Sequence, residues 1–286
     1  MSAEVLSARE VALAQAKSIV RSAGRALFRR VRRDRGHVAG EYDGGHWARM
    51  LETRPWESAG GLEEFLIGKS DQTILAKVDG RATRLTQREY YRYRIRAQAE
   101  LVRNELGASG DLVEIGAGYG ANLFALALAL PERRFIGLDI SPNGIAAGRA
   151  IAAHFGLESR VRFEALDLTD PNARAWPELA GRDCFSFFCL EQIPYDISTV
   201  ISRIAAARPR RVLHVEPTVE LLDLSRPADW ANYAYVKSVD YQTELFGVLD
   251  RMNREGAIRL LRTGRVGFAP TLQNDGFTAL WEPCKG

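Results

Sequence analysis

Hydrophobic and polar positions alternate in a regular way from residue 111 onward. Short apolar runs, which predict strands, are followed by longer segments with the apolar spacing of helices. The predicted strands are 111–115, 134–139, 160–166, 183–189 and 210–215, and the predicted helices are 121–130, 142–156 and 197–207. Strands that alternate with helices in this way are typical of βαβ units and a parallel sheet. The chain is therefore predicted to be an α/β protein.

Two further apolar runs near the C-terminus, 265–270 and 276–282, predict a final pair of strands. Asp275-Gly276 lies at the junction, and Asp-Gly is a strong signal of a tight hairpin turn, so we expect these strands to be antiparallel. The insert before them, residues 218–262, is rich in aromatic side chains: Trp230, Tyr233, Tyr235 and Tyr241. These residues suit either one wall of a substrate enclosure or ordinary packing against the core.

The N-terminal part predicts helices. Residues 3–33 show an interrupted apolar face, and the second half of this helix is rich in arginine from Arg21 onward. Such a helix can bind a membrane surface or an acidic partner, but a solvated face on a helix packed over the domain or against a second subunit is commoner. The glycine-rich stretch Gly36–Gly45 predicts a hinge, and residues 46–84 show no clear pattern.

Residues 86–107 predict a helix that carries an aromatic and basic stretch. Interleaved aromatic residues and arginines can stack on RNA bases. On a helix, however, Tyr90 and Tyr93 share one face while Tyr91 points elsewhere, which favours a packed lid. We therefore expect residues 1–107 to form a helical N-terminal cap and residues 108–286 to form the main α/β domain.

Composition narrows the class of protein without identifying it. Of the 286 residues, 46% are hydrophobic and 26% are charged, and the formal net charge of +3 is too small to indicate a nucleic-acid binder. No run approaches the roughly 18 apolar residues of a membrane span. Cys184, Cys189 and Cys284 lack metal-ligand spacing. These features predict a cytoplasmic protein with reduced thiols and no metal site.

A glycine loop follows the first of the regular strands. It reads Glu114-Ile-Gly116-Ala117-Gly118-Tyr-Gly120 and leads directly into a predicted helix. Glycines allow the backbone to turn tightly and let a ligand approach the amide groups, and the N-terminus of a helix adds unpaired N–H donors.

Two acids end the next two strands. Asp139 closes the strand after the loop, where a carboxylate can accept both hydroxyls of a ribose, and Asp167 closes the third strand beside Leu168. Either acid alone would be explained as a helix cap, but two acids at successive strand ends beside a glycine loop indicate a ligand site.

With these motifs the chain resembles the class I S-adenosylmethionine-dependent methyltransferases over residues 86 to 283. The resemblance rests on Glu114, Gly116, Gly118 and Gly120 in the loop, on Asp139 and Asp167 at the strand ends, and on the segment Phe188–Pro194. It implies a Rossmann-like, mostly parallel seven-stranded sheet with a C-terminal antiparallel hairpin. It also implies S-adenosylmethionine as cofactor, held by Glu114, Gly116, Ala117, Gly118, Asp139, Ile140, Asp167, Leu168 and Leu190.

A nicotinamide-dependent dehydrogenase is the main alternative. Gly116-x-Gly118-x-x-Ala121 satisfies the dinucleotide fingerprint, and Asp139 lies near the expected ribose position. Glu114 before the loop, Asp167 after the third strand and the final hairpin have no standard place in that class. They favour the methyltransferase.

The acceptor and the methylated element are not specified by these motifs. Candidates for catalysis follow the fourth and fifth regular strands, namely Glu191, Tyr195 and Glu216, whereas His214 is better explained as a core residue. Tyr91, Arg94 and Tyr195 are predicted to bind substrate, and Arg94 suits the carboxylate of an amino-acid-like acceptor. A small-molecule acceptor is favoured, with a peptide, protein or RNA acceptor as the alternative and a non-catalytic cofactor-binding module as a third possibility.

Overall fold

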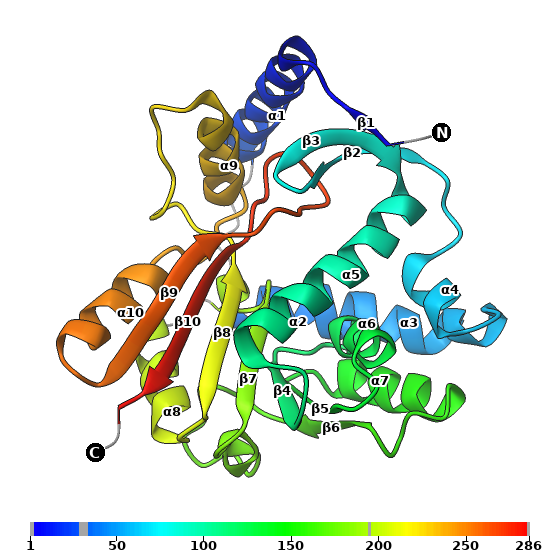
Figure 1. Cartoon of the computed structure of the whole chain (residues 1–286), viewed down its shortest axis with the longest axis vertical. Helices are drawn as coiled ribbons and strands as arrows, with labels where there is room; N and C mark the ends of the chain where they lie inside the picture. Colours follow the sequence, from blue (N-terminus) through cyan, green and yellow to red (C-terminus); the bar gives the residue numbers. More distant parts are fainter. Residues whose placement is uncertain (1–2, 29–33, 194–195, 285–286) are drawn as a thin grey trace.

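The computed structural model describes residues 3–28, 34–193 and 196–284. Within these residues the centre of the molecule is a seven-stranded sheet in the order β6-β5-β4-β7-β8-β10-β9 (Figure 1). Its strands are β4 (Asp111–Ile115), β5 (Arg134–Asp139), β6 (Val161–Ala165), β7 (Asp183–Phe187), β8 (Arg211–Glu216), β9 (Ile258–Arg265) and β10 (Phe277–Pro283). Neighbours from β6 to β8 are parallel, and β10 is antiparallel to both β8 and β9. The predicted Rossmann-like α/β fold is confirmed.

Helices cover both faces of this sheet because the parallel strands are apolar on both sides. One face packs against α5 (Gln87–Leu106), α6 (Ala121–Ala129) and α7 (Pro142–His154), and the other packs against α8 (Ile197–Ala206) and α10 (Leu245–Arg254). All carboxyl ends of the parallel strands meet at one edge of the sheet, which is where ligands of open α/β sheets bind. No helix in the described part of the chain is long and apolar enough to span a membrane.

The N-terminal region differs from the predicted helical cap. It begins with a short strand, β1 (Glu4–Val5), and then α1 (Ala8–Phe28), so the helix starts later than residue 3. Residues 29–33, which the prediction placed in the same helix, lie outside the described residues. Residues 46–84, which showed no clear pattern, contain a β-hairpin of β2 (Thr73–Val78) and β3 (Arg81–Thr86). With β1 these strands form a second, three-stranded sheet.

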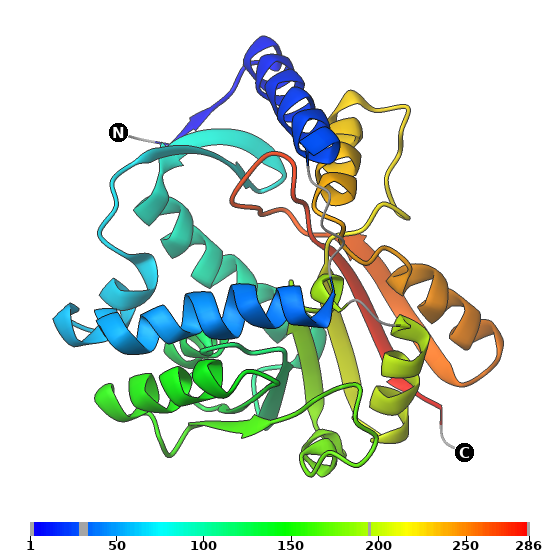
Figure 2. The same cartoon turned by 180° about the vertical axis from the view of Figure 1, so that it is seen from behind.

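The predicted hinge at Gly36–Gly45 is wrong, because these residues are helical. α2 (Arg35–Glu41) continues through a π-helical turn, Tyr42–Trp47, into α3 (Ala48–Thr53). In Figure 2 this segment, in blue, crosses in front of the sheet. Two short elements, Pro55–Ser58 and α4 (Leu62–Ile67), lead from it to the hairpin.

The aromatic stretch at the start of α5 supports the hairpin rather than a ligand. Tyr90 is fully buried in a small apolar cluster with Ala76 and Leu85, and Tyr91 packs against the same cluster. The Tyr93 hydroxyl accepts a hydrogen bond from the backbone N–H of Asp79 at 2.8 Å and donates one to its carboxylate at 2.9 Å. These tyrosines therefore fix the turn of the β2–β3 hairpin against α5.

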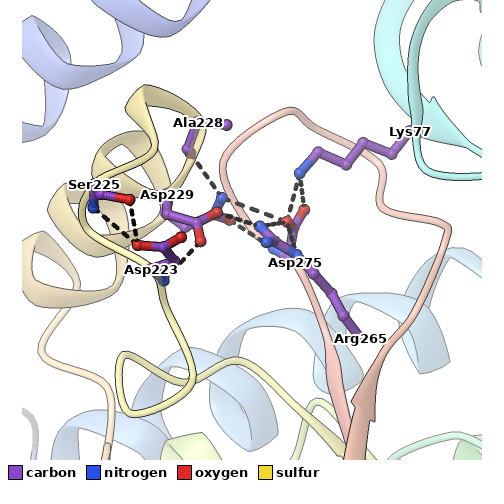
Figure 3. Close-up of polar contacts among 8 residues, drawn as sticks. Lys77, Asp223, Ser225, Ala228, Asp229, Arg265 and Asp275 are labelled. Atoms are coloured by element: carbon purple, nitrogen blue, oxygen red, sulfur yellow. Dashed lines mark hydrogen bonds and ion pairs between the residues drawn. The ribbon is translucent and has the colours of Figure 1, made fainter.

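The C-terminal hairpin exists, but its first strand and its turn were predicted wrongly. β9 is Ile258–Arg265, not 265–270, and it pairs with β10 through a long connection of residues 266–276. Asp275 forms no tight turn. Its buried carboxylate pairs with Lys77 of β2 and with Arg265 of β9, and Arg265 also pairs with Asp229 of α9 (Pro227–Ser238) at 2.7 Å (Figure 3). This ionic cluster, Lys77, Asp229, Arg265 and Asp275, joins the small sheet, the large sheet and the insert.

Candidate active site

A cavity of about 480 Å³ lies at the carboxyl ends of the parallel strands. Its walls come from the loops after β4, β5, β6 and β7, and α2 with the π-helical turn covers it. The lining residues are Arg35, Val38, Ala39, Tyr42, Asp43, Trp47, Arg94, Ile115–Tyr119, Ala121, Asn122, Leu138–Pro142, Leu166–Thr169, Phe187–Cys189, Gln192 and Ile193. Its volume lies within the usual range for a site that encloses a small organic ligand.

The glycine loop forms the floor of this cavity. Gly116, Gly118 and Gly120 all have positive φ angles, which side-chain-bearing residues rarely adopt. The amides of Gly116 and Ala117 donate to the Leu138 carbonyl at 2.8 and 3.0 Å, which ties the loop to β5. A Cβ atom at Gly116 would lie 1.8 Å from Cys189 Sγ, and one at Gly118 would lie 2.9 Å from the Trp47 ring. Close packing therefore requires glycine at both positions.

Asp139 stands at the end of β5 and faces the cavity. One carboxylate oxygen accepts the Gly118 N–H at 2.6 Å, and the other accepts the Ser141 N–H at 2.8 Å. Burial raises the pKa of Asp139 above its ordinary value, although these backbone hydrogen bonds oppose the rise. Each carboxylate oxygen keeps a second lone-pair direction, so the side chain can still accept hydroxyl groups from a ligand.

Asp167 lies after β6 at the far end of the cavity. One oxygen accepts both the N–H and the hydroxyl of Thr169, and the other accepts Arg35 Nη2 at 2.6 Å. Partial burial works against ionisation, but the Thr169 hydrogen bonds and the Arg35 guanidinium lower the pKa of Asp167 below its ordinary value. The ion pair also ties the first residue of α2 to the third strand end.

The helical cover over the cavity is defined here as residues 35–47. Asp43, in its π-helical turn, accepts the Ser141 hydroxyl at 2.5 Å and the Asn143 N–H at 2.9 Å, so it joins the cover to the N-terminus of α7. Trp47 packs edge-on against Tyr119 of the glycine loop, with ring centroids 5.2 Å apart. The cover is therefore held on the cavity by polar contacts at one point and by aromatic packing at another.

A short polar chain approaches the cavity beside the glycine loop. Arg94 of α5 donates to Asn122 Oδ1 at 2.9 Å, and Asn122 Nδ2 donates to Glu114 Oε1 at 2.7 Å. Glu114 is fully buried, which raises its pKa well above the ordinary value, and its second oxygen has no partner among the described residues. Arg94 and Asn122 line the cavity, whereas Glu114 acts on it through Asn122.

Glu191 and Glu216 lie behind the cavity wall instead of in it. Glu216 accepts the N–H groups of Cys189 and Leu190 at 3.0 and 3.2 Å and the Ser186 hydroxyl at 2.5 Å. Burial raises the pKa of both carboxyl groups. Glu216 raises the pKa of Glu191 further, whereas the hydrogen bond with Glu191 opposes the rise at Glu216, so Glu191 is the protonated member of the pair. Gln192, which does line the cavity, donates to Glu191 at 2.8 Å. The pair thus fixes the backbone and side chains of the wall after β7.

The structure brings most of the predicted cofactor residues to one cavity. Gly116, Ala117, Gly118, Asp139, Ile140, Asp167 and Leu168 line it, as does Arg94. Leu190, Glu191, Glu216 and Tyr91 are absent from its lining, and Tyr195 lies outside the described residues. None of the residues of the insert 218–262 lines the cavity, so the structure does not support a substrate enclosure formed by the insert. His214 is fully buried, and burial lowers its pKa to about 3, as suits a neutral core residue.

The sequence prediction missed the cover entirely. Arg35, Val38, Ala39 and Tyr42 line the cavity and follow the i, i+3, i+4, i+7 spacing of one helix face. That signal was present in the sequence, but the glycines between these residues indicated a break instead. Asn122, Phe187 and Phe188 were also missed, because their side chains are ordinary helix and strand residues without a motif of their own.

Comparisons with known proteins agree with this geometry. Residues 113–214, from β4 to β8, match the model of a methyltransferase domain. This part of the chain is therefore a methyltransferase domain. The glycine loop and the two strand-end acids, which predicted S-adenosylmethionine as the cofactor, lie within the matched residues. No curated protein sequence matches the chain.

Several solved structures resemble this chain in fold. The [4+2]-cyclase SpnF is 14% identical with a TM-score of 0.56, and the match covers 86% of this chain and 98% of the cyclase, so it shows the fold. A sarcosine dimethylglycine methyltransferase, so described, from Galdieria sulphuraria is 14% identical with a TM-score of 0.49, covering 70% and 89% of the two chains. The geranyl diphosphate C-methyltransferase of Streptomyces coelicolor A3(2) is 12% identical with a TM-score of 0.49, covering 68% and 80%.

Replacing Asp139 with alanine is expected to weaken cofactor binding about a hundredfold, or about 3 kcal/mol. The change removes the acceptor for ribose hydroxyls and also leaves the Gly118 and Ser141 amides without their partner. Isothermal titration with S-adenosylhomocysteine measures the dissociation constant. Asp111→Ala is the control, because Asp111 begins β4 at the opposite edge of the sheet. Unchanged affinity in Asp139→Ala would show that the ribose assignment is wrong.

Proposed function

We propose that this methyltransferase transfers the methyl group of S-adenosylmethionine to a small, largely apolar organic acceptor. One observation carries the proposal: the glycine loop and the two strand-end acids line a single cavity that also has an aromatic end. Phe187, Phe188 and Ile193 lie at that end, beside Gln192. Apolar walls with few polar groups suit a small organic molecule. The cover over the cavity also favours an enclosed small ligand over a peptide or an RNA strand.

The order of the strands supports one orientation of the cofactor. Along the sheet, Asp167, Asp139 and Gly116 follow the adjacent strands β6, β5 and β4, and Cys189 follows β7 next to them. Three strand spacings of about 4.8 Å give a row of about 14 Å. We propose that the adenine lies at Asp167 and Leu168, the ribose at Asp139, and the amino-acid end near Gly116, Asn122 and Arg94. The sulfonium then faces the residues after β7.

S-adenosylmethionine supplies an electrophilic methyl group that leaves its sulfur as the acceptor nucleophile attacks in line. The protein contributes alignment, which can account for much of the acceleration, and walls that exclude water. The carboxylates that line the cavity, Asp43, Asp139 and Asp167, all accept hydrogen bonds from the cover or the loops. Glu191 and Glu216 stay behind the wall. The proposal therefore places no general base among the described residues and requires an acceptor that is nucleophilic in its own right.

Binding and transfer test this function separately. Isothermal titration with S-adenosylmethionine, S-adenosylhomocysteine and NAD is expected to show micromolar binding of the two adenosyl compounds and no response to NAD. Binding of NAD alone would favour the dehydrogenase. Transfer is then measured with methyl-labelled cofactor against small aromatic and aliphatic nucleophiles, against peptides and against RNA. Transfer itself must be measured, because the same fold occurs in a protein described as a cyclase. Cofactor binding with labelling of RNA or peptide alone would contradict the small-molecule acceptor.

Arg94→Gln is expected to raise the dissociation constant of S-adenosylmethionine at least tenfold and to leave the acceptor KM unchanged. The reason is position: Arg94 contacts Asn122, directly after the glycine loop, where the proposed orientation places the carboxylate of the cofactor. Loss of one charge-assisted hydrogen bond has about this effect. Arg92→Gln, on the same helix but paired with Glu63 at the surface, is the control.

The opposite result for Arg94→Gln would assign this arginine to the acceptor instead of the cofactor. A raised acceptor KM with unchanged cofactor affinity would assign Arg94 to an amino-acid-like acceptor that presents its own carboxylate. That result would reverse the proposed role of Arg94 without affecting the cofactor assignment at Asp139.

A further inference from the structure

Helix α1 turns an unusual face toward the protein. It packs against α9, at the end of the molecule that lies away from the large sheet (Figures 1 and 2). The buried positions on α1 are polar or small: Gln15, Ser18 and Ser22. The hydroxyls of both serines are buried without a hydrogen-bond partner among the described residues. The packing of α1 on α9 therefore uses little of the apolar content of the helix.

The large apolar residues of α1 point to solvent. Leu13, Val20 and Leu27 are 56%, 71% and 79% exposed. They recur at intervals of seven residues, which places them on one side of an α-helix. A helix that packs in a globular protein normally turns such a stripe inward. Here the stripe is outward, so it is available for a partner.

Cations surround this stripe. At about 100° per residue, Arg9 and Lys17 lie within about 40° of Leu13 on its two sides, with Arg21 farther along the same flank as Lys17. All three side chains are exposed. The acid on the helix, Glu10, is already paired with Arg84 at 2.8 Å. The chain then continues through Arg29-Arg30-Val31-Arg32-Arg33 in the sequence, which adds four more cations.

We propose that the outer face of α1, namely Arg9, Leu13, Lys17, Val20, Arg21 and Leu27, docks on an anionic lipid surface. A helix with an apolar stripe and basic flanks lies in the plane of a membrane interface, with its apolar residues among the acyl chains and its cations at the headgroups. The charge pattern decides between partners. A second copy of this chain would bring the same cations against one another, and a nucleic acid would contact the cations but leave Leu13, Val20 and Leu27 exposed.

The position of this face gives it a link to the active site. α1 is joined by a few residues to the helical cover, whose Arg35, Val38 and Ala39 line the cofactor cavity. Docking at α1 would therefore hold the protein at a lipid surface by the segment that leads directly into the cover. The inference does not depend on the proposed acceptor, since it concerns a surface outside the cavity.

The test is binding of the full chain to vesicles of phosphatidylcholine with and without phosphatidylglycerol, measured by co-sedimentation. We expect binding to the anionic vesicles that weakens as salt is raised. The stripe variant Leu13→Gln/Val20→Gln/Leu27→Gln and the charge variant Arg9→Gln/Lys17→Gln/Arg21→Gln should each weaken it at least tenfold. Two matched controls should bind like the original: Leu128→Gln/Leu261→Gln removes exposed apolar residues elsewhere, and Arg254→Gln/Arg259→Gln/Arg262→Gln removes three exposed cations.

Folding and the other partners are checked on the same variants. All of them should keep their melting temperatures and their affinity for S-adenosylhomocysteine, because none of the substituted residues lines the cavity. The proposal is overturned if anionic vesicles are not bound, or if the controls lose binding as strongly as the two test variants. It is also overturned if the stripe variant only converts a dimer to a monomer, or if RNA binding is lost in the charge variant while the stripe variant binds RNA normally.

Discussion

Gly116→Ala is expected to abolish measurable binding of S-adenosylmethionine and to lower the free energy of unfolding by about 3 kcal/mol. Two effects combine. The φ angle of Gly116 is 75°, in the left-handed region, where an L-residue costs about 1–2 kcal/mol. The new methyl group would also lie 1.8 Å from Cys189 Sγ and 2.6 Å from its Cβ, so either the loop or the wall after β7 must shift. Overpacking of this kind costs about 1–3 kcal/mol.

The clash and the backbone strain can be separated. Gly110→Ala is the control, because Gly110 also has a positive φ of 83° but its Cβ would meet nothing within 4 Å. It should lose only the cost of the backbone strain and keep full affinity for the cofactor. The double variant Gly116→Ala/Cys189→Gly removes the clash and should recover part of the lost stability. Equal losses in Gly110→Ala and Gly116→Ala, measured by urea unfolding and titration calorimetry, would show that the contact with Cys189 has no effect.

The parallel part of the sheet and the cofactor end of the cavity could be predicted because their signals are local. Each strand from β4 to β8 is an apolar run within one stretch of chain, and the carboxyl ends of such strands must meet at one edge. The sequence therefore predicts that Gly116, Asp139 and Asp167 lie together at this edge. The position of Glu191 and Glu216 behind the cavity wall could not be predicted in this way. It depends on whether a side chain at a strand end points into the cavity or toward the neighbouring strand, which the spacing does not specify.

The dipeptide Asp-Gly forms a tight hairpin turn at one place in the chain and not at another. At Asp79-Gly80 both residues have positive φ, 48° and 74°, as a two-residue hairpin turn requires, and β2 and β3 pair directly on either side. Asp275-Gly276 forms no such turn, and Gly276 does not belong to the glycines with positive φ. A Cβ there would lie 3.1 Å from Val215 and Val266, so this glycine allows close packing. Only the first dipeptide has alternating strand residues on both sides.

The prediction placed the strand β9 too late in the sequence, at 265–270 instead of Ile258–Arg265. It is the outermost strand of the large sheet, and most of its residues are exposed, with Arg259, Arg262 and Arg265 among them. An edge strand of this kind carries charges that discourage pairing with other chains, so it lacks the apolar run by which strands are recognised. The apolar residues that follow, Val266, Phe268 and Ala269, pack into the cores as an irregular connection instead.

Asp275→Ala is expected to lower the free energy of unfolding by about 3–5 kcal/mol, the usual cost of breaking a buried ion pair by removing one partner. The Asp275 carboxylate is almost fully buried and accepts from Lys77, from Arg265 Nε at 2.8 Å and from Asn232 at 3.4 Å (Figure 3). Arg265 keeps Asp229 after the change, whereas Lys77 loses its direct acceptor. Burial lowers the pKa of Lys77, and the attraction of Asp275 opposes that shift, so the lysine depends on this partner to stay charged.

Because Asp275 does not line the cavity, the loss of stability should appear without a loss of cofactor affinity in the folded protein. Urea unfolding measures the first quantity, and titration with S-adenosylhomocysteine measures the second. Asp223→Ala is the matched control, since this neighbouring acid is exposed and caps only Ser225. In a double-mutant cycle, Lys77→Met should cost less in the Asp275→Ala background than alone, because the uncompensated charge has been removed. Additive losses would show that Lys77 and Asp275 do not stabilise each other, and that the small sheet is held to the rest of the protein by its backbone pairing with residues 267–269.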